Sequence, residues 1–98
     1  MSGDEKRATI RIDKWLWHAR FFRTRSLAAE MAHSGHIRVD GRTIEKAGYG
    51  VGAGQVLVFP QGNRVRSVKI LQCGARRGPA AEAQTLYEDL DPPEAPHV

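Results

Sequence analysis

The hydrophobic positions of this 98-residue chain recur at two different periods, and the change of period divides it into a helical part and a strand part. Near the N-terminus the apolar residues are spaced by three and four positions, as on one side of an α-helix. This spacing predicts a helix from residue 14 to about residue 21 and a second helix over residues 25–33. We expect Asp13 and Thr24 to be their N-caps, and Gly35 to follow the second helix.

The same spacing assigns side chains to the core or to the surface. The apolar stripe of the first helix comprises Ile12, Trp15, Leu16 and Ala19, and the stripe of the second comprises Leu27, Ala28 and Met31. Outside the first stripe lie Lys14, Trp17, His18 and Arg20. Because Trp15 is expected in the core, we expect Trp17 either at its rim or as a surface on which a base stacks. Phe21 and Phe22 are expected to pack in the core and between the helices.

Beyond Gly35 apolar and polar residues alternate with a period of two, which is typical of strands. We expect strands over residues 36–39 and 42–44, joined by a two-residue hairpin turn at Asp40-Gly41. A glycine-rich bend follows. After it, a buried strand starts at residue 55 and should end at Pro60, because proline cannot donate to a sheet.

A last strand is predicted over residues 64–71, with Val68 and Ile70 pointing inward. Residues from 80 to about 90 have helical composition. The expected fold is therefore α+β, in which two short N-terminal helices pack on a small, mostly antiparallel sheet that is followed by a C-terminal helical tail. We expect Leu86 and Tyr87 to dock this tail on the body.

Composition and length indicate three segments: a disordered leader (1–9), one compact domain (10–73), and a basic linker with a short helix and an acidic, proline-rich tail (74–98). The charged N-terminus predicts no secretory signal, and no apolar run approaches the roughly 18 residues that a membrane span needs. A single cysteine, Cys73, is typical of a reducing compartment. We expect a cytoplasmic monomer.

Charge is divided unevenly along the chain. Residues 1–78 contain all 15 Lys and Arg against six acids, a net charge of +9, whereas residues 79–98 contain five acids and no Lys or Arg, a net charge of −5. A basic body predicts a polyanionic partner. One hypothesis is that the acidic tail shields the basic face.

The basic residues are densest in residues 11–26, where five of them are interleaved with four aromatic residues. Cationic side chains around two short helices are suited to an RNA backbone. The expected phosphate contacts are Arg11, Lys14, Arg20, Arg23 and Arg25, with Asp13 orienting a neighbouring guanidinium. Thr24 and Ser26 stand at a helix N-terminus, which can bind phosphate or be merely capped. Contacts from the first strand and hairpin are expected from His36 and Arg38, and less directly from Arg42 and Lys46, with Trp17 as a stacking candidate.

The amino-acid sequence of these segments resembles that of a known family. The matching residues are Arg-Ile-Asp-Lys-Trp-Leu at 11–16, Arg20, Thr24-Arg25-Ser26 and Gly35-His36-Ile37-Arg38-Val39-Asp40-Gly41, which are similar to the S-four RNA-binding domain. Residues 76–83, with Leu86-Tyr87-Glu88, resemble the tail of the small bacterial ribosome-associated heat-shock proteins (the Hsp-fifteen type). The resemblance implies a stress-related protein that binds rRNA of free large ribosomal subunits carrying a nascent chain on peptidyl-tRNA. Asp40 departs from the family, where asparagine is usual, which puts a turn-side RNA contact in doubt.

Catalytic and cofactor sites are not predicted. The glycines at 48–54 lack the preceding strand and following helix of a dinucleotide site. His33, His36 and Cys73 lack a fourth metal ligand. We therefore expect no enzyme, no cofactor, no metal and no small-molecule substrate. The open alternatives are a tRNA- or stalled-subunit-binding quality-control factor, an accessory subunit that targets an RNA-modifying enzyme, and, more weakly, a DNA-binding protein.

Overall fold

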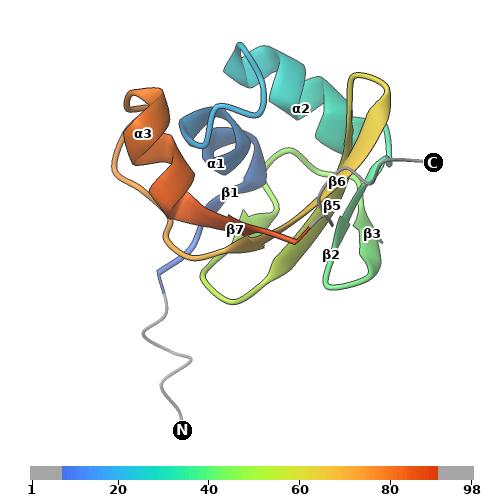
Figure 1. Cartoon of the computed structure of the whole chain (residues 1–98). Helices are drawn as coiled ribbons and strands as arrows, with labels where there is room; N and C mark the ends of the chain where they lie inside the picture. Colours follow the sequence, from blue (N-terminus) through green and yellow to red (C-terminus); the bar gives the residue numbers. More distant parts are fainter. Residues whose placement is uncertain (1–7, 91–98) are drawn as a thin grey trace, which may run out of the picture.

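The structure, a computed structural model, describes residues 8–90, so the predicted leader and the end of the acidic tail lie largely outside the described residues. Within this range the chain forms helices and antiparallel strands in one α+β unit (Figure 1). The helices are α1 (Ile12–His18), α2 (Arg25–His33), α3 (Ala80–Ala83) and the 3-10 helix η2 (Gln84–Leu86). The strands are β1 (Ile10–Arg11), β2 (Ile37–Val39), β3 (Arg42–Ile44), β4 (Gly50–Val51), β5 (Val56–Gln61), β6 (Arg64–Ile70) and β7 (Tyr87–Asp89). No helix among residues 8–90 is long and apolar enough to cross a membrane.

A five-stranded antiparallel sheet in the order β3-β2-β5-β6-β7 forms one layer, and α1 and α2 lie together against it (Figure 1). The predicted hairpin is confirmed: Asp40 and Gly41 both have positive φ, 52° and 83°, as a tight turn between β2 and β3 requires. A second, two-stranded sheet pairs β1 with β4 and was not predicted. Its two-residue strands are too short to show a period in the sequence.

The core lies between α1 and the inner face of the sheet. Trp15 and Leu16 are fully buried there, as are Leu57 and Phe59 of β5. The indole Nε1 of Trp15 donates to the carbonyl of Gln72 at 2.8 Å, so its polar group is also satisfied. Burial of each such side chain stabilises the fold by roughly 1.5–3 kcal/mol. The expected inward direction of Val68 and Ile70 is confirmed, since both are fully buried.

The predicted helix from residue 80 to about 90 is wrong beyond its first turns. The chain leaves η2 at Leu86 and forms β7, which pairs with β6 so that Tyr87 stands opposite Ile70. Tyr87 packs against Phe21, with 4.6 Å between the ring centroids, and Leu86 is buried. The docking role expected for both residues is therefore confirmed, although a strand provides it. Pairing with an open sheet edge outweighs a weak helical propensity.

Three smaller expectations also need correction. Leu27, placed on the apolar stripe of α2, is 45% exposed, whereas Ala28 and Ala32 are the buried residues of that helix. His18, expected off the stripe, is buried, and its Nδ1 lies 3.3 Å from the carbonyl oxygen of Cys73. β5 continues past Pro60 to Gln61. Because β2 pairs with β5 only at Leu57 and Val58, the missing N–H of Pro60 falls where β5 has one open side.

Candidate nucleic-acid interface

A buried carboxylate at the start of α1 organises the basic cluster. The side chain of Asp13 is only 4% exposed, and it accepts hydrogen bonds from Arg11, from Nε to Oδ1 at 3.1 Å and from Nη2 to Oδ2 at 3.2 Å. Arg25, at the start of α2, forms a second ion pair with this carboxylate, with Nε 3.5 Å from Oδ2. Asp13 thus ties together two guanidinium groups from two elements. We name these three residues the Asp13 cluster.

The predicted N-cap role of Asp13 is wrong. α1 begins at Ile12, one residue before Asp13, and Arg11 stands at the cap position without a side-chain cap bond. Instead, the backbone N–H groups of Ile12 and Asp13 donate to the carbonyl oxygens of Tyr49 and Ala47. The β1–β4 pairing brings this loop to the helix end, so the first N–H groups are satisfied without a capping side chain. This leaves the carboxylate of Asp13 free to bind arginines.

Charge in the Asp13 cluster favours the ionised pairs. Burial alone would raise the pKa of Asp13, but the hydrogen bond from Arg11 and the charges of Arg25 and Arg11 outweigh it, and the pKa lies below its ordinary value. The same bond raises the pKa of Arg11. With two guanidiniums against one carboxylate, the cluster keeps a net positive charge while its arginines are held in a fixed orientation.

The N-terminus of α2 extends this surface. Thr24 is its N-cap as predicted, because its Oγ1 accepts from the backbone N–H of Leu27 at 3.1 Å. Ser26 is exposed in the first turn, beside Arg25. Exposed Arg23 and partly exposed Lys14 form no ion pair with any residue in the described range. Four cationic groups and a helix N-terminus therefore gather at the α1–α2 junction.

Arg20 differs from the other predicted contacts because it also holds the fold. Its Nε donates to the carbonyl oxygen of Gly78 at 2.6 Å. Its backbone has φ 67°, and α1 ends around it with Arg20 N–H bonded to Trp17 O and Phe21 N–H bonded to Leu16 O. This is a Schellman ending with arginine at the position that glycine usually occupies. Its predicted phosphate contact stays a prediction.

The strand contacts lie on the other side of α2. The burial of β2 alternates as expected, with Ile37 and Val39 inward and Arg38 outward. His36 is exposed, and its Nδ1 lies 2.7 Å from the hydroxyl of Ser34. Arg42 and Lys46 are exposed along and after β3.

Asp40, the residue that departs from the family wording, has a structural role. Its Oδ1 accepts from the backbone N–H of Val56 at 2.9 Å, and its own N–H donates to the carbonyl of Val56 at 2.8 Å. These bonds join the β2–β3 turn to β5. The carboxylate oxygen is thereby used within the fold, as an asparagine oxygen would be.

Trp17 is partly buried at the rim, where one ring face is covered by Arg77, whose Cζ lies 5.7 Å from the ring centroid. From the sequence, Arg77 is expected in a basic linker and in the segment that resembles the heat-shock-protein tail, without an assigned RNA contact. Its proximity to Trp17 depends on how residues 74–79 cross the body, which no local pattern shows. The structure therefore adds Arg77 to the cationic groups that neighbour the predicted interface.

The fold and the basic junction define an S4-type RNA-binding module, and comparison with known proteins agrees. The S4 domain model matches residues 10–57, and the chain belongs to the S4-domain family.

Within that family it is similar to heat shock protein 15. It is 40% identical over 87 residues to the heat shock protein 15 homolog of Aeromonas salmonicida. The aligned region covers 89% of this chain and 65% of the relative. The chain thus spans less than two thirds of that relative's length.

For two further proteins, the region similar to this chain covers most of the relative's own length. The RQC P-site tRNA stabilizing factor of Listeria monocytogenes is 35% identical over 83 residues, 83% of this chain and 89% of the relative. The solved trimeric structure of Vibrio cholerae heat shock protein 15 superposes with a TM-score of 0.78 at 36% identity, covering 84% of this chain and 82% of that one. The predicted fold class and family resemblance are confirmed.

Proposed function

We propose that this protein binds structured rRNA of the large ribosomal subunit, on free subunits that still carry a nascent chain on peptidyl-tRNA. The observation that carries this proposal is the Asp13 cluster, in which a buried carboxylate fixes two guanidiniums at the junction of two helices. An arginine that is already oriented loses less entropy when it binds a phosphate. Recognition would then rest on the charge and shape of a folded RNA.

The proposed contacts follow the geometry of the junction. The primary contacts are Arg11, Lys14, Arg23, Thr24, Arg25 and Ser26, with Asp13 as the residue that positions them. His36 and Arg38 flank them across α2, Arg20 adds a contact while it holds Gly78, and Trp17, Arg42 and Lys46 lie at the periphery. We propose residues 10–73 as the RNA-binding domain. The protein is proposed to be a cytoplasmic, non-enzymatic monomer.

The relatives support the ribosomal setting. One of them is named for stabilising P-site tRNA, and a large subunit that retains peptidyl-tRNA holds such a tRNA. The same name favours a second candidate, a quality-control factor on stalled large subunits. Both candidates predict binding to large subunits that hold peptidyl-tRNA, and they differ in whether the nascent chain is needed in addition to the tRNA.

The test is sucrose-gradient cosedimentation with separated small subunits, bare large subunits, and large subunits carrying peptidyl-tRNA, at two salt concentrations. We expect salt-sensitive binding to large subunits that is strongest when peptidyl-tRNA is present. A Lys14→Ala/Arg23→Ala variant should bind weakly, because the substitutions remove two phosphate contacts. They remove no ion pair within the described part of the fold.

The control is Lys69→Ala, which removes one positive charge from β6, away from the α1–α2 junction. Equal binding by this variant and the wild-type protein shows that the effect is local. Binding to small subunits alone, or equal binding by the double variant, contradicts the proposal. Binding that is equally strong when an uncharged tRNA replaces peptidyl-tRNA favours the quality-control factor.

A further inference from the structure

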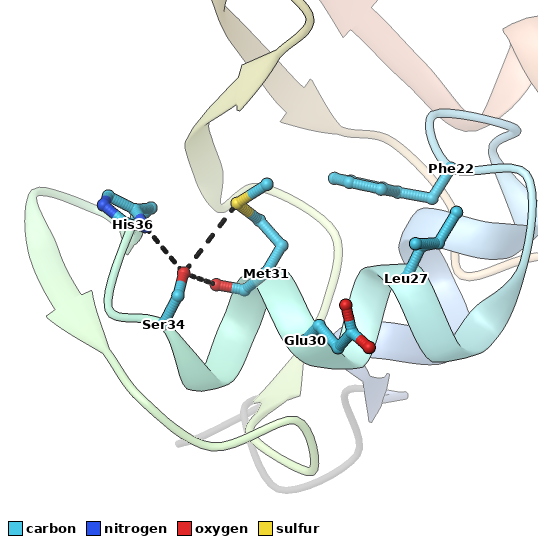
Figure 2. Close-up of a pocket in the computed structure, with 6 residues that line it drawn as sticks. All are labelled: Phe22, Leu27, Glu30, Met31, Ser34 and His36. Carbon is cyan, nitrogen blue, oxygen red and sulfur yellow. Dashed lines mark hydrogen bonds between the residues drawn. The ribbon is translucent and has the colours of Figure 1, made fainter.

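A shallow groove of about 480 Å³, which the sequence pattern does not predict, runs along α2. Figure 2 shows Phe22 and Leu27 at one end, His36 at the other, and Met31 between them. The lining is mainly apolar, and Leu27 is 45% exposed because no residue in the described range covers it fully. Exposed apolar side chains that gather in a hollow make it a candidate binding surface.

The polar groups of the groove are few and specific. Ser34 Oγ donates to the carbonyl of Met31 at 2.7 Å and also bonds His36 Nδ1, so the imidazole is held at one end (Figure 2). The carboxylate of Glu30 lines the groove and forms no ion pair within the described range. A carboxylate accepts hydrogen bonds but repels a phosphate.

The groove continues onto the outer face of the sheet. His36 also lines a second hollow of about 370 Å³, together with Arg38, Val58, Pro60 and Val65. Val65 is 64% exposed. The two hollows are neighbours, because His36 lines both of them. In addition, Phe22 of the first packs on Phe59, which lines the second, with 6.1 Å between ring centroids. We name the two hollows together, from Leu27 to Val65, the α2 groove.

Charge decides which partner fits. Arg38 lines one end, and exposed Arg23 is the residue after Phe22, which lines the other end. Cations therefore lie near both ends of an apolar floor whose one carboxylate among the described residues is that of Glu30. Unpaired nucleotides match this arrangement, because their bases offer flat apolar faces and N–H donors while their phosphates stay outside. A second copy of a chain with net charge +4 would instead bring like charges together.

We propose that the α2 groove binds the bases of an unpaired RNA segment, with phosphates held by Arg23 and Arg38 and a base N–H donated to Glu30. This inference rests on the proposed function and extends it from a folded RNA backbone to an adjoining single strand. A base would stack on the ring of Phe22 and contact Leu27, and the next would lie over Val58 and Pro60 beyond His36.

The test compares two labelled RNA probes by fluorescence anisotropy: a hairpin with a single-stranded loop, and the same stem as a blunt duplex. Leu27→Ser should weaken binding of the hairpin roughly tenfold while leaving duplex binding and the slope of affinity against salt unchanged. Phe22→Leu should act in the same direction. Glu30→Gln should change the preference among loop bases, since its amide also donates.

Leu71→Ser is the matched control, because Leu71 is 44% exposed, nearly the same as Leu27, and lies after β6. Failure of the wild-type protein to bind either probe overturns this inference together with the proposed function. Binding of both probes with no effect of Leu27→Ser or Phe22→Leu overturns the inference alone.

A second copy of this chain is the other molecule that could cover the groove, because the Vibrio cholerae relative is described as trimeric. Sedimentation velocity tests for it. We expect the wild-type protein and Leu27→Ser to have the same mass. Self-association of the wild-type protein that Leu27→Ser abolishes would show that a second copy covers the groove, and would overturn the RNA assignment.

Discussion

The guanidinium of Arg20 donates to the carbonyl oxygen of Gly78 at 2.6 Å, from a backbone position with φ 67°. A left-handed conformation costs a residue with a Cβ roughly 1–2 kcal/mol. The fold therefore keeps a strained arginine where glycine would be unstrained. The hydrogen bond to the C-terminal segment offsets part of this strain.

Replacement of Arg20 separates the two effects. Arg20→Ala loses the hydrogen bond and keeps the strain, so its free energy of unfolding should fall by about 1 kcal/mol. Arg20→Gly loses the same bond but relieves the strain, and should be about as stable as the wild-type protein. Urea denaturation of the three proteins measures the difference. A glycine variant no more stable than the alanine variant would contradict the role assigned to φ.

The unexpected helix end at Arg20 shows what the sequence could predict and what it could not. Thr24, Gly35 and Asp40-Gly41 act through their own backbone or near neighbours, so their roles were correctly predicted. Arg20 carries no local signal for a left-handed conformation, because the residue that it contacts lies 58 positions later.

The candidate site was likewise predictable only where it depends on local sequence. The clustering of basic residues near two helices was readable from the sequence, but the role of Asp13 was not. Its N-cap assignment failed because the carbonyls of Ala47 and Tyr49 satisfy the helix end from a distant loop. The predicted helix that became β7 failed for a related reason, since only the finished sheet offers an edge to Tyr87.

Asp13 should contribute to stability in a pH-dependent way. Because its folded-state pKa is below the ordinary value, its contribution is complete above the unfolded-state pKa and is lost as the pH falls through the folded-state pKa. Asp13→Asn should lower the free energy of unfolding by about 1–3 kcal/mol at pH 7, and the gap to the wild-type protein should begin to narrow below about pH 4. Urea denaturation at pH 7, 5 and 3 checks this.

Glu45→Gln is the control for that series, since Glu45 is an exposed carboxylate. Its stability should follow the wild-type protein at neutral pH within about 0.5 kcal/mol. A difference between Asp13→Asn and the wild-type protein that persists undiminished at pH 3 would exclude the ionised cluster as its source.

The number of phosphate contacts is measurable from salt dependence. Lys14→Ala/Arg23→Ala should reduce the log–log slope of RNA affinity against salt by roughly 1.4 to 1.8, which corresponds to two phosphates at about 0.7 each on a single strand or about 0.9 each on a duplex. Its free energy of unfolding should stay within about 0.5 kcal/mol of wild type, because both side chains lack partners in the described part of the chain. Titrations at four salt concentrations give the slope. An unchanged slope would remove both residues from the interface.

The C-terminal segment should be part of the cooperative fold. Leu86 is 4% exposed, so Leu86→Ala should lower the free energy of unfolding by about 2–4 kcal/mol. Leu90 is 41% exposed, so Leu90→Ala should change the free energy of unfolding by less than about 0.5 kcal/mol. Denaturation followed by tryptophan fluorescence reports on Trp17 and on Trp15, whose Nε1 bonds to the adjoining Gln72. Equal effects of the two substitutions would contradict the packing of this segment.

The pairing of Arg11 with Gly50 has a consequence for synthesis on the ribosome. Arg11 emerges early from the exit tunnel, but β4, which pairs with its backbone, is made only after the β2–β3 hairpin is complete. A nascent chain that stops before Gly50 therefore lacks the strand pairing at the start of α1. We expect the full affinity for RNA to arise only late in translation, once this pairing can form.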